Sequence, residues 1–153
     1  MTDVEIFEIV NQFKAAQTVL TGGEPSLFID EDFIKGLKKS TGRRVAIETN
    51  GTRKLPDGID WVTVSPKSGM SESGDTELKV DHADELKVVF TGQPLDPYFG
   101  LRCVGESTVM LLQPCFVEDE KQYKKNIADT VSAVLADPRW RLSLQTHRFI
   151  GVK

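Results

Sequence analysis

Apolar positions along the chain follow two patterns, and each pattern predicts a different kind of element. Apolar residues at helical spacing predict helices at Asp3 to about Lys14, at about Glu31 to Ser40, and at 119–136. Short runs of consecutive apolar residues between polar or Gly/Pro clusters predict strands instead. The six predicted strands are Thr18–Thr21, Val45–Glu48, Trp61–Val64, Glu85–Phe90, Val109–Leu112 and Trp140–Leu144.

The predicted helices carry start and stop signals in the sequence. Thr2 and Glu5 match a capping box before the first helix, and Asp30 is the expected N-cap of the second. Thr41-Gly42 is expected to end the second helix, and Asp137-Pro138 the third. The residues of the second helix expected to face the core are Phe33, Ile34 and Leu37.

The order and composition of the strands predict an α/β fold. Several strands alternate with helices, and runs such as Val88-Val89-Phe90 and Met110-Leu111-Leu112 are continuously apolar. Both features are typical of a parallel sheet that is buried on both faces. The Ser/Gly-rich segment Ser68–Asp75 is expected to be a loop. No repeat or linker divides the chain, so residues 1–153 are predicted to form a single domain.

Composition narrows the classes of function. The chain has 153 residues, of which 39% are hydrophobic and 27% charged, as in ordinary globular proteins. Its net charge of −4 and the lack of a basic stripe argue against binding to nucleic acid. No apolar run is long enough to span a membrane. The acidic N-terminus leads directly into a helical pattern without a signal peptide, so the cytoplasm is the expected location.

Polar or Gly/Pro clusters directly follow the predicted strands. Ligands of parallel α/β folds bind at the carboxyl ends of strands, so these clusters could build one shared site. The alternative is that they are polar only because the chain must turn there. The clusters are Thr21–Pro25, Glu48–Gly51, Ser65–Lys67, Thr91–Pro94, Gln113–Pro114 and Gln145–His147.

The first cluster, Thr-Gly-Gly-Glu-Pro, indicates a particular ligand chemistry. Gly22 and Gly23 let backbone amides approach a ligand with no Cβ between them, and Pro25 fixes the turn. A carboxylate at Glu24 beside bare backbone suits a ligand that carries an amino group. The alternative is that Glu24 serves only as an acceptor for loop amides.

Other candidate residues also have two interpretations. Glu48 and Asn50 can accept hydrogen bonds from ribose hydroxyls, but Asn50-Gly51 is equally a common turn pair. Lys67 fits either a ligand or solvent, and His147 fits either the site or the core.

These segments, in this order, resemble the radical S-adenosylmethionine superfamily and, more narrowly, the 7-carboxy-7-deazaguanine synthases. The Gly-Gly-Glu-Pro step is that superfamily's motif for the methionyl amino group. The resemblance covers nearly the whole chain. The residues that carry it are Val19–Pro25, Ile47–Thr52, Val64–Lys67, Glu85–Lys87, Leu112–Pro114 and Trp140–His147.

The resemblance implies a fold, an activity and a set of cofactors. The fold would be a partial (β/α) barrel of the radical S-adenosylmethionine type, with a mainly parallel sheet. The activity would be that of a carbon–nitrogen lyase in queuosine and deazapurine biosynthesis, which contracts the ring of 6-carboxy-5,6,7,8-tetrahydropterin to 7-carboxy-7-deazaguanine. The implied cofactors are S-adenosylmethionine, a 4Fe–4S cluster and magnesium, and the implied assembly is a homodimer.

The resemblance also implies site residues. Gly23 and Glu24 would contact S-adenosylmethionine, Thr21 would contact the pterin, and the carboxylate of Lys153 would reach the substrate. The residues implied to line or close over the nucleoside are Ser65, Pro66, Lys67, Gln113, Pro114, Cys115 and Phe116.

The chain departs from the family at the cluster ligands. The family binds its cluster through three cysteines on the loop after its first strand, whereas this chain has only Cys103 and Cys115, which are expected to be structural thiols. The first strand and its cysteine loop are therefore expected to be missing, and the chain alone to be inactive. The alternatives are truncation of an ordinary synthase, a remnant that binds S-adenosylmethionine or a nucleoside without catalysis, and a different radical enzyme.

Overall fold

The computed structural model describes residues 1–67 and 77–152. The predicted loop Ser68–Asp75 and the predicted substrate contact Lys153 lie outside the described residues. The strands in the described part of the chain form one sheet. Its strands are β1 (Gln17–Leu20), β2 (Arg44–Thr49), β3 (Trp61–Val64), β4 (Glu85–Phe90), β5 (Val109–Pro114) and β6 (Trp140–Leu142).

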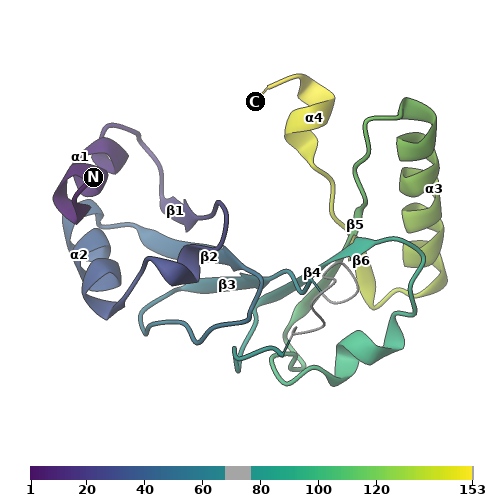
Figure 1. Cartoon of the computed structure of the whole chain (residues 1–153), viewed down its shortest axis with the longest axis horizontal. Coiled ribbons are helices and arrows are strands. Elements are labelled where there is room, and N and C mark those ends of the chain that lie inside the picture. Colours follow the sequence, from purple (N-terminus) through teal and green to yellow (C-terminus); the bar gives the residue numbers. More distant parts are fainter. Residues whose placement is uncertain (68–76, 153) are drawn as a thin grey trace.

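The sheet keeps the order of the sequence, and every neighbouring pair of its six strands is parallel. Each strand that was predicted is present, and its ends lie within two residues of the predicted ones. Because parallel neighbours all point the same way, the polar clusters that follow them meet at one edge. Figure 1 shows the sheet running from β1 beside α1 and α2 to β6 beside α3.

Helices connect and flank the strands. The α-helices are α1 (Asp3–Asn11), α2 (Glu31–Thr41), α3 (Glu120–Ala136) and α4 (Thr146–Ile150), and two short 3-10 helices are η1 (Pro25–Leu27) and η2 (Asp96–Gly100).

The predicted capping box of α1 and the predicted caps of α2 are confirmed. The Thr2 side chain accepts a hydrogen bond from Glu5 N, and the Glu5 carboxylate accepts one from Thr2 N at 2.7 Å, which completes the capping box. Asp30 accepts from Phe33 N at 2.8 Å, and Gly42 ends α2 with a left-handed φ of 67°. α1 ends three residues before the predicted Lys14, since the backbone bond of Gln12 runs to Ile9 and tightens the last turn.

The prediction that both faces of the sheet are buried holds for the middle of β2 and for β3, where consecutive residues are buried, but it was wrong for β4 and β5. Alternate residues of β4 and β5 are buried, and those between them are only half-buried. The buried residues join Trp140 in one core cluster, while Phe33, Ile34 and Leu37 of α2 form a second with Val45. The other face is accessible because the helices do not cover it. It carries Glu48, Glu85, Lys87 and Gln113 among its partly exposed residues.

The C-terminal end also differs from the prediction. β6 stops at Leu142 rather than Leu144, after which Ser143 N donates to Leu112 O at 2.8 Å. The chain then turns into α4, which was not predicted. α4 has only five residues and none of them is buried, so it leaves no apolar periodicity in the sequence.

Candidate functional site

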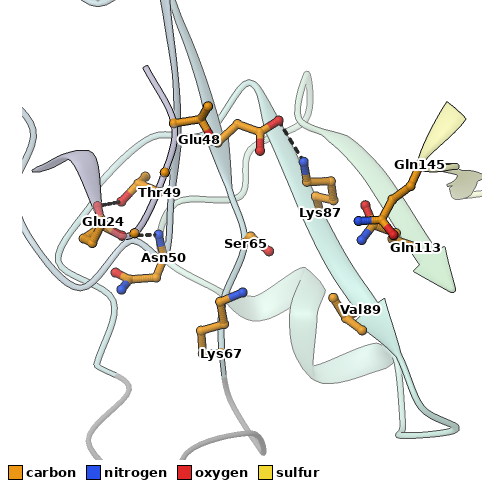
Figure 2. A pocket seen from close by; sticks show the side chains of 13 residues that line it. Glu24, Glu48, Thr49, Asn50, Ser65, Lys67, Lys87, Val89, Gln113 and Gln145 are labelled. Carbon is orange, nitrogen blue, oxygen red and sulfur yellow. Dashed lines mark hydrogen bonds and ion pairs between the residues drawn. The ribbon is translucent and has the colours of Figure 1, made fainter. Parts of the chain in front are cut away.

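A cleft of about 230 Å³ opens where the strands of the sheet end (Figure 2). It borders a second, larger cavity of about 530 Å³, and the two share Glu48, Lys87, Gln113 and Gln145. We call these two spaces together the strand-tip basin. The cleft is lined by Thr21, Gly22, Gly23, Glu24, Glu48, Thr49, Asn50, Ser65, Lys67, Lys87, Val89, Gln113 and Gln145.

The two glycines of the first strand tip leave backbone exposed in the cleft. A Cβ added at Gly22 or Gly23 would meet no other atom within 4 Å, so the space beside them is open. Gly22 has a φ of 119°, which residues with a side chain rarely adopt. This tip can therefore bring peptide groups directly against a ligand.

Glu24 joins the tip of β1 to the tip of β2. Its Oε1 accepts hydrogen bonds from the Ser26 hydroxyl and the Thr49 hydroxyl, both at 2.7 Å, and from Ser26 N at 3.2 Å. Its Oε2 accepts from Asn50 N at 2.8 Å (Figure 2). The arrangement supports the structural role for this carboxylate, with Oε2 the less occupied oxygen.

Burial of Glu24 opposes its ionisation, but its hydrogen bonds favour the charged form. The bonds from Ser26, Asn50 and Thr49 together hold the pKa of Glu24 below its usual value. The carboxylate is therefore anionic at neutral pH, and it can attract an ammonium group placed beside Oε2.

Asn50 is part of a turn, which was the second of the two roles predicted for it. Its Oδ1 accepts from Thr52 N at 2.9 Å and from the Thr52 hydroxyl at 2.7 Å. The side-chain oxygen is thus engaged, and the group that Asn50 can offer a ribose is its NH₂. Gly51 follows with a φ of 79°.

An ion pair that the sequence did not predict crosses the floor of the basin. Lys87 Nζ lies 2.9 Å from Glu48 Oε1, and the lysine side chain is only 17% exposed. Next to it, the Thr63 hydroxyl donates to Glu85 Oε2 at 2.8 Å. Glu85 and Lys87 alternate with apolar residues in β4, and that alternation was the available signal for a polar face.

The structure brings most of the predicted site residues together, but not all of them. Ser65, Lys67 and Gln113 line the cleft, whereas Pro66 is not among its lining residues. Pro114 is fully buried, because the residue after Gln113 in a strand points to the opposite face.

The two residues after Pro114 also lie elsewhere. Cys115 lines a separate cavity beside α3 with Asn126, which donates to Cys115 O at 2.8 Å. The ring of Phe116 packs edge-on against Tyr123 and beneath the guanidinium of Arg148. His147 borders the larger cavity of the basin and is exposed, so of its two interpretations the one that placed it in the core was wrong.

The donor set of the basin fits S-adenosylmethionine better than it fits a metal cluster. Exposed peptide groups, an anionic Glu24 and the polar side chains of Ser65 and Lys67 suit an amino acid joined to a nucleoside. Among the described residues, no group of three His, Cys, Asp or Glu side chains could hold a metal ion. Cys103 is buried, which raises the pKa of its thiol, so the residues present do not fit a 4Fe–4S cluster.

No helix within residues 1–67 and 77–152 has both the length and the apolar character needed to cross a membrane.

The chain is similar to proteins of known name over its full length. It is 44% identical to the 7-carboxy-7-deazaguanine synthase of Bacteroides thetaiotaomicron, over 153 residues that make up all of this chain and 74% of the relative. It is 45% identical to the enzyme of the same name from Nitratidesulfovibrio vulgaris, over 88% of this chain and 58% of that relative. A scan against models of protein families gives no match.

The fold has a solved counterpart in the crystal structure of QueE from Escherichia coli. The two structures superpose with a TM-score of 0.73 at 27% sequence identity, over 95% of this chain and 64% of that one. The fold and the site thus define an α/β protein of the radical S-adenosylmethionine partial-barrel type, as the sequence predicted. Within that class, the chain belongs to the family of the 7-carboxy-7-deazaguanine synthases.

Proposed function

We propose that this chain provides the S-adenosylmethionine and substrate sites of a 7-carboxy-7-deazaguanine synthase, a carbon–nitrogen lyase of queuosine and deazapurine biosynthesis. The observation that carries the proposal is the strand-tip basin. It gathers Gly23, Ser65, Lys67 and Gln113, which come from three different strand tips, in a chain of this family. The chain spans about three quarters of one relative and less than two thirds of the next, so the activity of a whole synthase is part of the proposal.

Each of the two ligands would occupy its own part of the basin, S-adenosylmethionine the cleft and the substrate the larger cavity. The cleft, with its bare glycine backbone and anionic Glu24, would take the methionyl part of S-adenosylmethionine, and Ser65 and Lys67 would line its nucleoside. The larger cavity, with Glu48, Lys87 and His147, would take the tetrahydropterin. When bound, S-adenosylmethionine would supply the radical chemistry typical of the superfamily, while this chain's residues bind, orient and shield the reactants.

Titration calorimetry with S-adenosylmethionine tests the first half of this proposal. Lys67→Ala is expected to weaken binding roughly tenfold, because it removes a cationic donor from the cleft. Lys121→Ala is the matched control, since Lys121 is an exposed lysine outside the cleft, on α3. Absence of binding by the unaltered chain, or equal affinities for the two variants, would contradict the assignment.

The cysteine content leads to a second expectation. Anaerobic reconstitution of the 153-residue polypeptide with iron and sulfide is expected to give no stoichiometric cluster and no turnover of 6-carboxy-5,6,7,8-tetrahydropterin, since two cysteines on separate parts of the fold cannot bind one. Visible absorbance and iron content measure this directly. A full complement of cluster on these 153 residues would refute the expectation.

A different function, binding of S-adenosylmethionine or a nucleoside without catalysis, shares the cleft but not the larger cavity. The two functions separate when 7-carboxy-7-deazaguanine is used as the probe. A synthase binds this product in the larger cavity, so S-adenosylmethionine in the cleft does not compete with it. A site for S-adenosylmethionine alone does not bind the product. The homodimer implied by the resemblance and the cytoplasmic location expected from the sequence remain predictions.

A further inference from the structure

The C-terminal helix α4 contributes to the basin although little holds it in place. Its five residues include none that is buried, and its N-cap residue, Gln145, makes no capping bond with its side chain. A helix this short is not stable on its own in water. Gln145 nevertheless lines both parts of the basin, and His147 lines the larger cavity. Some contact outside the helix must therefore fix this segment.

Arg148 makes that contact. Its guanidinium carbon lies 3.5 Å from the centre of the Phe116 ring, which is the geometry of a cation–π pair. Phe116 is itself braced edge-on by Tyr123 of α3, with ring centres 5.2 Å apart. The stack thus ties α4 to the end of β5 and to the longest helix of the fold.

The same arginine sets the orientation of Gln145. Arg148 Nε donates to Gln145 Oε1 at 2.9 Å, and Arg148 N donates to Gln145 O at the same distance. A guanidinium can only donate, so the carbonyl oxygen of the carboxamide must face it and the NH₂ group must face away. Within the described part of the chain, no residue accepts a hydrogen bond from that NH₂.

We propose that Arg148, stacked on Phe116, is a positioning residue that holds the segment before α4 and presents the Gln145 NH₂ to the basin as a donor. The ligand group that Gln145 would meet is an acceptor, such as the carbonyl oxygen or an unprotonated ring nitrogen of a planar heterocycle. The ligand part of this inference rests on the proposed function. It gives Phe116 a role in the site through Arg148 rather than through direct contact with the nucleoside.

Variants at Arg148 test the positioning role without any ligand. Arg148→Ala and Arg148→Lys are both expected to speed hydrogen exchange of residues 144–152 roughly tenfold, because lysine keeps the charge but lacks the planar group and the Nε donor. Arg139→Ala is the matched control, since Arg139 also stacks on an aromatic ring, Phe99 at 4.0 Å, but lines neither part of the basin. Unchanged exchange in Arg148→Ala, or full protection in Arg148→Lys, would overturn the proposal.

A variant of Gln145 tests the donor role separately. Gln145→Glu keeps an acceptor for Arg148 Nε–H, whose NMR signal should persist, but it removes the NH₂ group. We expect this variant to bind 7-carboxy-7-deazaguanine roughly tenfold more weakly than the unaltered chain does. Equal affinity of Gln145→Glu and the unaltered chain for 7-carboxy-7-deazaguanine would refute the donor role. If the unaltered chain binds S-adenosylmethionine but not 7-carboxy-7-deazaguanine, both the donor role and the substrate half of the proposed function fail, while the exchange result still decides the role of Arg148.

Discussion

At the scale of single residues, Glu24 is both a structural link and a charge. Its four hydrogen bonds come from Ser26, Thr49 and Asn50, so it ties the tip of β1 to the tip of β2. Replacing Glu24 by Gln keeps one side-chain oxygen but turns the other into an NH₂ group. That NH₂ would face groups that can only donate or already donate to Glu24, so hydrogen bonds would be lost. We expect Glu24→Gln to lower the free energy of unfolding at pH 7 by about 1–3 kcal/mol. Glu106→Gln, at an exposed position, should change it by less than about 0.5 kcal/mol.

The pH dependence of the Glu24 effect follows from the direction of its pKa shift. The pKa in the folded protein is lowered from 4.5, so the stability that ionised Glu24 contributes is fully present above that value. It is lost as the pH falls through the lower folded value, because the unfolded chain then takes up the proton more readily. The stability gap between the unaltered chain and Glu24→Gln should therefore narrow in urea unfolding below about pH 4. A gap that stays constant into acid would contradict this.

Gly51 is required for two reasons that act together. Its φ of 79° is unfavourable for other residues, and an added Cβ would lie 2.8 Å from Leu78 and 2.9 Å from Val64. Both neighbours belong to the core, so they have little room to move. We expect Gly51→Ala to cost about 2–4 kcal/mol of unfolding free energy. Gly105→Ala should cost far less, because a Cβ there meets nothing within 4 Å, and equal urea midpoints for the two variants would refute the argument.

At the scale of elements, the N-cap of α2 stabilises the helix that packs against β2, one of the strands whose tips form the site. Asp30 accepts from Phe33 N at 2.8 Å, and α2 buries Ile34 and Leu37 beneath β2, whose tip carries the Glu24 bonds. Asp30→Ala is expected to lower the free energy of unfolding by about 1 kcal/mol, and Asp30→Ser to restore most of it. Chemical denaturation measures both. If serine fails to recover what alanine loses, the cap is not the cause.

The sequence predicted elements well wherever the signal was local. Apolar runs identified all six strands, and short-range caps identified the ends of α2. α4 was missed because what holds it is a stack between Arg148 and Phe116, which are distant in sequence. The ion pair of Lys87 was missed because its partner Glu48 lies 39 residues away, and no local pattern connects the two. The candidate site was therefore predictable at its strand tips, but not on the inner face of its sheet.

At the scale of the whole molecule, one face of the sheet packs into the hydrophobic core and the other lines the basin. The helix-covered face supplies the core, and the open face supplies a polar basin that shares its lining with the strand tips. This division explains why alternate residues of β4 and β5 differ in burial. The core residues could vary while the apolar character is kept, whereas the ion pair of Glu48 and Lys87 depends on both partners.

The outer edge of β1 leads to a prediction about assembly. Within residues 1–67 and 77–152, β1 pairs only with β2, and Val19 on this strand and Phe13 just before it are 49% and 64% exposed. An apolar edge strand favours association, which agrees with the homodimer that the family resemblance implies. We expect static light scattering to give the mass of a dimer at micromolar concentration.

A charge on this edge should reverse the association. Val19→Lys is expected to shift the chain toward the monomer, since a lysine on an edge strand opposes pairing with another chain. Leu135→Lys is the control, because Leu135 is 81% exposed but lies on α3, at the other end of the sheet. If the unaltered chain is monomeric, or if both lysine variants dissociate the dimer equally, the edge of β1 is not the interface. If only Val19→Lys dissociates it, the first strand tip, and with it the Gly22-Gly23 backbone of the cleft, lies beside the dimer interface.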